Sequence, residues 1–491
     1  MTNPPFGGLG TISDLTDDES AILNELWQVW TAKMRRNLLR SQYYDQRNLL
    51  EDLGIGIPPH MVNLNAVLGW PAKAVDVLSR RCKLEGFTLP SVDGDPLGIR
   101  ELWTDNDMDV ELPQAITSAF LHSCTFVMAT QGDTTAGEPP VLISSQSALY
   151  GAGLWDSRLR RLRAALSITS TDDMGRVTEF VLFLPRVTIR CVWDRKWTAY
   201  RYPHTLDRLP VEVLPSQPRL DRPFGKSRIS RAVMGLADSA FRTMVRLESH
   251  AEFFSGPQRY AMGADESMFQ DAEGNALTQW QAVMGRVWAA PRDDEGNVPQ
   301  MGQFAATPPT PHGDQIRILA SLFCGETSLP LSALGIVHDN PASAEAIEAA
   351  ERDLIVEAKY AMDCFGPRLT RIVKTAIEIR DGSLPDSARD LAARWSAPEN
   401  PLLSASADAM VKTVGALPWL VDSQIPLEML DWDEATIRRA MADKRKATVS
   451  TLMQRLTNGG NSAGAPGATG SGQRPGAEGS GGAVAAGSNT P

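Results

Sequence analysis

The sequence has few of the features that mark secreted, membrane or metal-binding proteins. Its 491 residues include only five cysteines, which lie at least 40 residues apart in the chain. An odd number so widely spaced excludes a disulfide framework and a close-spaced zinc cluster, and it indicates a reducing compartment. No stretch approaches the ~18–20 uninterrupted apolar residues of a membrane span. The first 18 residues lack a basic start followed by an apolar run, so we expect no secretory signal.

Positive charge is also in short supply. The chain has 48 lysines and arginines against 59 aspartates and glutamates, which gives a formal net charge of −11. A protein that binds DNA through its phosphates needs a cation for each phosphate that it neutralises, so a conventional nucleic-acid-binding protein is disfavoured. Hydrophobic residues make up 43% of the chain and charged residues 22%, and we expect two or three folded domains with a large core.

Catalytic signatures are missing as well. Residues 224–227 (Phe-Gly-Lys-Ser) end like a phosphate-binding loop, but Leu220 stands where that loop needs its first glycine. Pro223 would also remove one of the backbone N–H groups that hold phosphate, so we predict a turn before a helix. The six histidines show no pair at helical ligand spacing, and Gly-x-Ser-x-Gly is absent. The sequence therefore predicts no catalytic residue, no metal and no cofactor.

Two charged clusters imitate binding sites. Asp105, Asp107 and Asp109 have the spacing of a calcium loop, but Val110 and Ile116 replace its glycine and its final glutamate, which favours a solvated acidic turn. The densest basic cluster consists of Arg158, Arg160, Arg161 and Arg163. On a strand, the last two of these arginines share a face, which either contacts phosphate or is solvated. Because exposed arginine is common, a solvated face is favoured.

Apolar periodicity predicts helices at both ends of the chain and strands between them. A helix begins at Asp17, where Thr16 and Glu19 have the spacing of a capping box. Strands occupy about residues 119–214, with a hairpin turn at 185–186. Further helices are expected at 66–81, 227–255, 314–324, 341–380 and 435–456. The apolar stripe of the first long helix packs either within its own subunit or against a neighbouring subunit, and the sequence fits both.

The end of the chain has a different composition. Residues 457–491 are rich in glycine, alanine and serine, and their only charged residues are Arg474 and Glu478. Such a segment buries too little apolar surface to offset the entropy that ordering would cost. We therefore predict a disordered tail after residue 456.

Several short segments, taken in order, resemble a known family. They are residues 43–59, 75–87, 222–229, 256–260, 326–330 and 334–347. The last, with Leu-Gly-Ile followed by Asp-Asn-Pro-Ala-Ser-Ala-Glu-Ala-Ile, is the most specific. On this set, which extends from about residue 43 to residue 445, the chain is identified as a member of the portal proteins of long-tailed, double-stranded DNA bacteriophages.

The resemblance implies an α+β fold, the phage portal fold, with a mixed α/β wing, long paired stem helices, a small α/β clip and a helical crown. It also implies assembly as a ring, typically of twelve subunits. The implied divisions are an N-terminal arm and first helix (1–42), wing (43–226), stem helix (227–255), clip (256–313), second stem helix (314–324), tunnel loop region (325–339), long wing helix (340–394), crown (395–456) and tail (457–491).

The family further implies a channel at one capsid vertex, through which DNA is packaged and later ejected. The channel constriction would be the tunnel loop, which consists of Ser332, Ala333, Leu334, Gly335, Ile336, Val337, His338 and Asp339. Its first six residues carry no charge, which suits a sliding contact; an ordinary packed connector is the alternative. A net acidic channel would repel phosphate and let DNA move.

The partners that the resemblance implies are further copies of the chain, double-stranded DNA bound without sequence preference, the large terminase, the major capsid protein, the head-to-tail connector and a scaffold protein. No membrane partner is implied. The implied locations are the virion and, during assembly, the host cytoplasm. A structural DNA conduit without catalytic activity is favoured. An enzyme of the packaging machinery, an ATPase or nuclease, is the alternative, and residues 225–227 are its only support.

Overall fold

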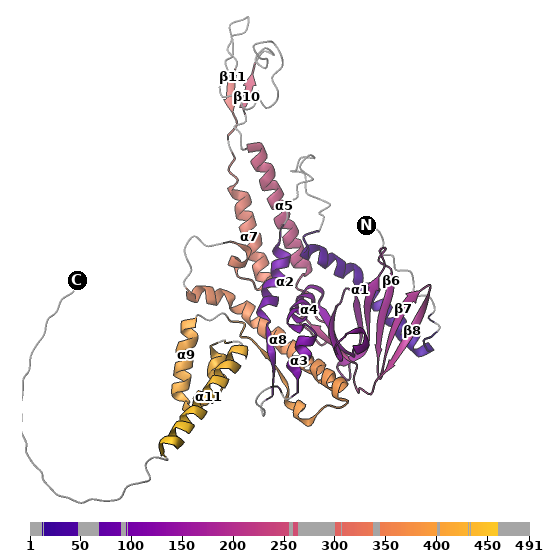
Figure 1. The fold of residues 1–491 in the computed structure, drawn as a ribbon. Helices are drawn as coiled ribbons and strands as arrows, with labels where there is room; N and C mark the ends of the chain where they lie inside the picture. The colour runs from indigo at the N-terminus through magenta and orange to yellow at the C-terminus, as the bar shows by residue number, and fades with distance from the viewer. Residues whose placement is uncertain are drawn as a thin grey trace, which may run out of the picture. The chain divides into compact units, whose positions relative to one another are not determined.

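The structure is a computed structural model, and it describes residues 12, 14–47, 68–89, 95, 97–254, 259–263, 300–305, 307–336, 344–399, 403–430, 432 and 434–459. The chain divides into two units, Met1–Pro401 and Leu402–Pro491. The first unit combines helices with antiparallel sheets, and the described part of the second is helical (Figure 1). The predicted mixture of helix and sheet is confirmed.

Two antiparallel sheets form the strand-rich part of the first unit. The smaller has the order β3-β2-β9, with β2 at Cys124–Gln131, β3 at Val141–Ser147 and β9 at Val211–Pro215. The five strands of the larger follow chain order: β4 (Gly151–Asp156), β5 (Arg161–Thr171), β6 (Val177–Leu184), β7 (Val187–Asp194) and β8 (Lys196–Pro203). The predicted hairpin is confirmed, because Leu184 pairs with Val187 across a two-residue turn.

Helix α1 (Asp17–Tyr44) begins with the predicted capping box and covers the larger sheet. The Glu19 N–H donates to Thr16 Oγ1 at 3.3 Å, and the Thr16 N–H donates to Glu19 Oε2 at 2.9 Å. The buried face of the helix packs on the sheet through Leu23, Leu26, Trp30 and Met34. Trp30 is 1% exposed, and its indole N–H donates to the Leu149 carbonyl at 2.8 Å, which satisfies the one polar group of that side chain.

A layer of helices covers the smaller sheet. Helices α4 (Met108–His122) and α8 (Ala344–Asp381) contact its strands, and α2 (Trp70–Arg81) contacts both helices. The rings of Phe120 and Phe365 meet in the core between α4 and α8, with centroids 5.8 Å apart. The smaller elements of this region are β1 (Leu84–Thr88), α3 (Ile99–Asp105), η2 (Thr134–Ala136), η5 (Asp386–Asp390) and β12 (Ala392–Trp395), which pairs with β1.

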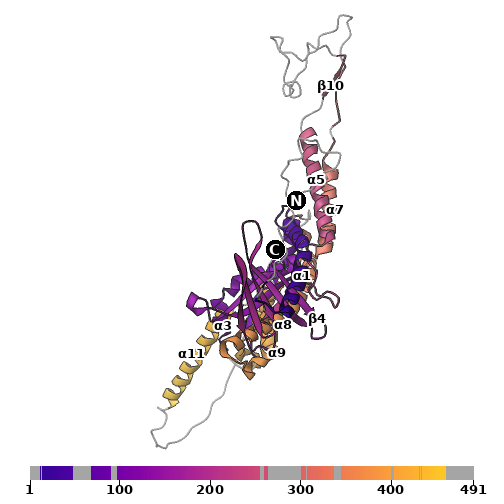
Figure 2. The same cartoon turned by 90° about the vertical axis from the view of Figure 1, so that its right-hand side faces the viewer.

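A pair of long helices projects from the rest of the first unit. Helix α5 (Arg231–Phe254) leads outward and α7 (Thr310–Thr327) returns beside it, as both views show (Figures 1 and 2). A hairpin of β10 (Arg259–Met262) and β11 (Gln300–Gln303) lies beyond their outer ends. After α7 the chain forms the short helix η4 (Leu331–Leu334) before α8.

The second unit contains helices in all its described segments. They are α9 (Leu403–Ala416), η6 (Pro418–Asp422), α10 (Ile425–Met429) and α11 (Glu434–Gly459). Within this unit, Lys444 donates to the Val421 carbonyl at 2.7 Å and to Asp422 Oδ1 at 2.9 Å. This ties α11 to η6. None of the helices in the described parts of either unit is long and apolar enough to cross a bilayer.

Several predicted boundaries differ from the structure. Residues from 119 to 122 belong to α4, and strand β2 begins only at Cys124. Helix α7 begins at Thr310, four residues before the prediction, because Pro311 in its first turn needs no N–H partner. Trp395, predicted to open the crown, ends a strand that pairs with β1 in the first unit. Helix α11 also includes the first three residues of the predicted tail.

Candidate functional site

The α5–α7 pair is held together by its own apolar faces. Val233, Ala237 and Ala240 of α5 are buried, as are Ala320 and Phe323 of α7. The sequence did not decide whether the apolar stripe of this helix packs within its own subunit or against a neighbour. Over the first three turns of α5, the stripe is buried within the same chain. At the outer end, the His250 ring lies 2.8 Å from the Thr307 carbonyl oxygen and 5.5 Å, centroid to centroid, from the His312 ring.

Two apolar side chains of α7 remain outside this packing. Ile318 is 61% exposed and Leu322 is 56% exposed. They are four residues apart, so they lie one above the other on the same face of the helix. Isolated exposed leucines and isoleucines are common on monomers, but an adjacent pair on a long projecting helix is a candidate contact for another chain.

The inner end of the pair is joined to the rest of the unit by one arginine. Arg228, only 8% exposed, donates to the carbonyls of Ala74 in α2 and Thr327 in α7, and to the carboxylate of Glu357 in α8. These bonds connect three helices to the residue that leads into α5. A buried guanidinium needs such a full set of acceptors, because an unpaired buried charge is costly.

Two further contacts fix the base of α5. The hydroxyl of Ser230 donates to Glu326 Oε1 at 3.0 Å, which links the ends of α5 and α7. The Tyr43 hydroxyl donates to both oxygens of Asp238, at 3.0 and 2.8 Å, which links α1 to α5. Burial, followed by this bond, raises the pKa of Tyr43, and burial raises the pKa of Asp238.

The predicted tunnel loop lies directly after this junction. Of its eight residues, the structure describes Ser332 to Ile336; Val337, His338 and Asp339 fall outside the described residues. Ala333, Leu334 and Ile336 are half-buried against the main core, while Ser332 and Gly335 are exposed. Gly335 has φ +79°, a left-handed conformation that glycine adopts most easily. The described part of the loop is thus anchored by its apolar side chains.

The β10–β11 hairpin presents exposed apolar side chains. Tyr260 and Phe304 contact each other with ring centroids 5.0 Å apart, and they are 37% and 57% exposed. A side chain at Gly302 would come within 2.4 Å of the Tyr260 ring, so that ring packs over the glycine and would have to move to admit a larger residue. Most of the predicted clip, residues 256–313, lies outside the described residues.

The segments that only partly match known binding motifs have structural roles. The turn before α5 contains Gly225 at φ +73°, and the Ser227 hydroxyl donates to the Leu121 carbonyl at 2.6 Å, so this segment is a packed turn, as predicted. Asp109 accepts from the Trp103 indole at 2.9 Å. The carboxyl of Glu25 pairs with Arg163, which is exposed although the next five residues of β5 are buried. Among the described residues, no group of three potential ligands could hold a metal ion.

Sequence reasoning missed the Arg228 junction and the exposed pair on α7. Arg228 precedes an amphipathic helix, as many exposed arginines do, and its acceptors come from segments 100 or more residues away in most cases. No local pattern marks it. Ile318 and Leu322 could have been found, because they fall off the buried stripe of a helix whose remaining exposed positions are mostly polar.

Comparisons with known proteins add independent information. Residues 23–418 match the family described as phage portal protein, SPP1 Gp6-like. The portal protein of Mycobacterium phage L5 is 28% identical over 417 residues, which cover 81% of this chain and 83% of the phage protein. The portal protein of Mycobacterium phage D29 is 28% identical over 387 residues, with coverage of 76% and 78%.

Solved structures give more distant similarities. The neck of an empty gene transfer agent particle contains a chain with 13% identity and a TM-score of 0.43, covering 76% of this chain and 94% of that one. The neck of the native particle contains a chain with 11% identity and a TM-score of 0.44, with coverage of 81% and 93%.

Proposed function

This chain belongs to the SPP1 Gp6-like family of phage portal proteins, and from that premise we propose how its parts serve a portal. The family match over residues 23–418 is the observation that carries the function. The protein acts as a portal at the vertex of a phage capsid and is a component of the virion neck. A portal needs a closed assembly, an open channel and surfaces for its partners.

We propose that the chain assembles into a closed ring, of twelve copies, around a channel for double-stranded DNA. A ring arises when one face of a subunit binds a different face of the next and the rotation closes. The exposed pair Ile318 and Leu322 on α7 supports this assembly, because it offers apolar surface that its own chain does not cover. In the ring, α5 and α7 serve as the paired stem helices.

The tunnel loop, Ser332 to Asp339, serves as the channel constriction. Its support is the position of the described residues directly after the Arg228 junction, together with exposed Ser332 and Gly335, neither of which carries charge. An uncharged contact holds DNA weakly. The net charge of −11 per chain adds a general repulsion of phosphate, which suits a polymer that has to move in both directions.

The other parts face the partners of the portal. Residues 256–313, which include the β10–β11 hairpin, serve as the clip that docks the large terminase during packaging and the head-to-tail connector afterwards. The sheets and α8 serve as the wing, near the major capsid protein and a scaffold protein, and the second unit serves as the crown. The subunit is made in the host cytoplasm and assembles there.

The portal has no catalytic activity of its own in this proposal. The segment 225–227, the one feature that suggested an ATPase, is occupied by structural contacts, since the Lys226 N–H donates to the Ser216 carbonyl and Ser227 to Leu121. ATP hydrolysis by the purified protein should stay at background and should not change in Lys226→Ala. A burst or steady turnover that Lys226→Ala abolishes would favour the enzymatic alternative.

Negative-stain electron microscopy of the purified full chain tests the ring. We expect top views of an annulus with twelvefold symmetry and a central hole wide enough for duplex DNA, about 20 Å. Sedimentation in parallel should give the mass of the same assembly. A sample that is monomeric at every protein concentration and at several salt concentrations would contradict the proposal.

A further inference from the structure

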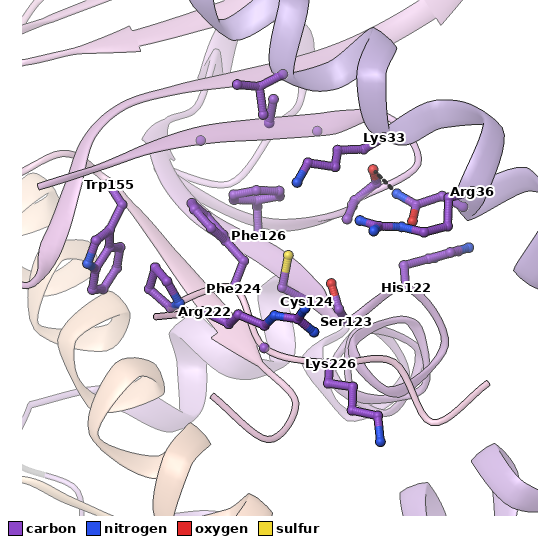
Figure 3. Close-up of a pocket in the computed structure, with 18 of the residues that line it drawn as sticks. Lys33, Arg36, His122, Ser123, Cys124, Phe126, Trp155, Arg222, Phe224 and Lys226 are labelled. Carbon is purple, nitrogen blue, oxygen red and sulfur yellow. Dashed lines mark hydrogen bonds between the residues drawn. The ribbon is translucent and has the colours of Figure 1, made fainter. Parts of the chain in front are cut away.

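A hollow on the first unit lies apart from the stem helices and the tunnel loop. It has a volume of about 510 Å³ and lies between the second half of α1, the beginning of β2, strand β4 and the loop 221–226 (Figure 3). We call it the cationic pocket. Its lining includes Lys33, Arg36 and Arg40 of α1, and Arg222 and Lys226 of the loop.

No carboxylate in the described parts of the chain neutralises the cations of this pocket. Its one acidic residue, Asp221, is bound at 2.7 Å by Arg219. Arg40 donates to Asn37 and to the His122 carbonyl, both uncharged acceptors. Within the described residues, the other four cations of the lining, Lys33, Arg36, Arg222 and Lys226, form no ion pair with a carboxylate. In a chain of net charge −11, such a concentration of unpaired positive charge is conspicuous.

The geometry brings these charges toward a common space. Lys33 and Arg36 reach in from α1, and Arg222 reaches in from the opposite wall; Lys226 points away from them (Figure 3). Burial, and then the charge of Arg36, lower the pKa of Lys33 and lower that of Arg40 to about 10. The cations therefore repel one another, and a bound anion would relieve that repulsion.

The histidine of the pocket adds no charge to it. His122 lies 2.9 Å from the hydroxyls of Ser41 and Ser147, one at each ring nitrogen. Burial and the charge of Arg40 lower its pKa to about 4, so the ring is neutral at pH 7. The positive charge of the site therefore comes from its lysines and arginines alone.

One wall of the pocket is aromatic. The Phe224 ring contacts Trp155 and Phe126, with centroids 6.0 and 6.3 Å away, and both Trp155 and Phe224 are half-exposed. Aromatic faces beside a group of cations suit a ligand that joins a flat ring to a negative charge. Single-stranded nucleic acids are bound in this way, with stacked bases and neutralised phosphates.

We propose that the cationic pocket binds the phosphate group of a nucleotide unit, free or within a DNA strand, with the base against Trp155 and Phe224. A second hollow of about 280 Å³ shares Arg222 and Lys226 and adds Arg219, Gln217, Pro218 and Tyr360. Arg222 and Lys226 thus line both hollows, so their charge is available to a ligand that spans the two. This favours a ligand with repeated negative charge, and phosphodiesters have that property. The site goes beyond the portal channel, because its residues belong to neither α5, α7 nor the tunnel loop.

Fluorescence anisotropy with a labelled octathymidylate tests the site in the assembled full chain. Lys33→Gln with Arg222→Gln should weaken binding by about tenfold and lower the slope of log K against log salt by about 0.7 for each cation removed. Arg35→Gln is the matched control, because Arg35 is exposed on the same helix but does not line the pocket. It should leave affinity within about twofold.

A further variant and several competing ligands show which kind of anion the pocket binds. Trp155→Leu should weaken octathymidylate but not an abasic octamer of equal charge, because only the first loses a stacked base. Thymidine monophosphate should compete at the same site, though at higher concentration. The proposal is overturned if the double variant binds as the Arg35 control does, or if octaglutamate displaces the probe as well as unlabelled octathymidylate does. Images of each variant show separately whether rings form, so failure of ring assembly and failure of the site are distinguishable.

Discussion

At the scale of single residues, Arg228 joins three helices of the first unit. It is 8% exposed and binds three acceptors on α2, α7 and α8. Replacing it with an apolar side chain leaves the half-buried carboxylate of Glu357 without its cation and two carbonyls without their donor. The loss then exceeds that of an ordinary surface ion pair.

Arg228→Met should therefore lower the free energy of unfolding by about 3–5 kcal/mol, as measured by urea denaturation. Arg163→Met is the control. Arg163 also binds a carboxylate, that of Glu25, but both side chains are about half exposed, and the loss should be below about 1 kcal/mol. Equal losses in the two variants would mean that Arg228 does not join these helices.

A second residue sets the acid sensitivity of α1. Hydrogen bonds from Arg201 hold the pKa of Glu19 at about 2, well below its ordinary 4.5. Because the folded pKa is the lower one, the ionised pair contributes stability above about pH 4.5, and this contribution is lost as the pH falls toward 2. Since Arg201 is 40% exposed, solvent screens the pair and the effect is modest.

Glu19→Gln should remove that pH dependence. The thermal midpoint of the variant should lie below that of the original chain at pH 6, and the gap should narrow at pH 3. Differential scanning fluorimetry across this range measures both. A gap that stays constant from pH 6 to pH 3 would show that the charge of Glu19 contributes nothing, and that only its capping contact with Thr16 matters.

At the scale of elements, α7 has two distinct faces. Ala320 and Phe323 pack inside the unit, whereas Ile318 and Leu322 do not. A carboxylate at either exposed position costs little in the single chain, because the side chain stays in water. In a ring whose neighbours cover this face, the same carboxylate would be buried without a partner.

Ile318→Asp and Leu322→Asp should therefore shift the protein from rings to smaller species, with little change in the thermal midpoint of the subunit. Sedimentation velocity measures the shift. Ala232→Asp adds the same charge at an exposed position of the paired helix α5, outside this face of α7, and should leave rings intact. Rings that survive both substitutions at 318 and 322 would place the subunit interface on other elements.

The elements that were predicted well are those with a clear local signal in the sequence. The capping box at Thr16 and the hairpin at residues 185–186 carry their geometry in adjacent residues, so both are confirmed. Helix α4 was missed for the opposite reason. Its last turn, residues 119–122, is buried, and so is most of β2 directly after it, so periodicity could not separate helix from strand there.

The two candidate sites also differ in how far the sequence could predict them. The tunnel loop follows from family order alone, and its role stays a prediction; the structure adds that only Ser332 and Gly335 of its described residues are exposed. The cationic pocket could not be predicted, because its cations come from residues 33–40 and 222–226. Only the fold brings them together, and each cluster alone is an unremarkable set of charged residues.

At the scale of the whole molecule, the net charge of −11 acts on assembly. Neighbouring copies in a ring repel each other, and salt screens this repulsion over about 30 Å at 0.01 M but about 10 Å at 0.1 M. The fraction of protein in rings should therefore rise between about 0.02 and 0.3 M sodium chloride, as measured by sedimentation. A fraction that falls with salt would mean that ion pairs between copies outweigh the general repulsion.

The contacts of the Arg228 guanidinium are the point about which the α5–α7 pair would tilt relative to the rest of the first unit. Helix α5 has 24 residues, so it is about 36 Å long. A tilt of about 5° at the junction displaces its outer end by about 3 Å. The same tilt pulls on the carbonyl of Thr327, immediately before the tunnel loop, and on Glu357 of α8. A force applied at the distal hairpin is thereby transmitted, at reduced amplitude, to the segment that we propose as the tunnel loop.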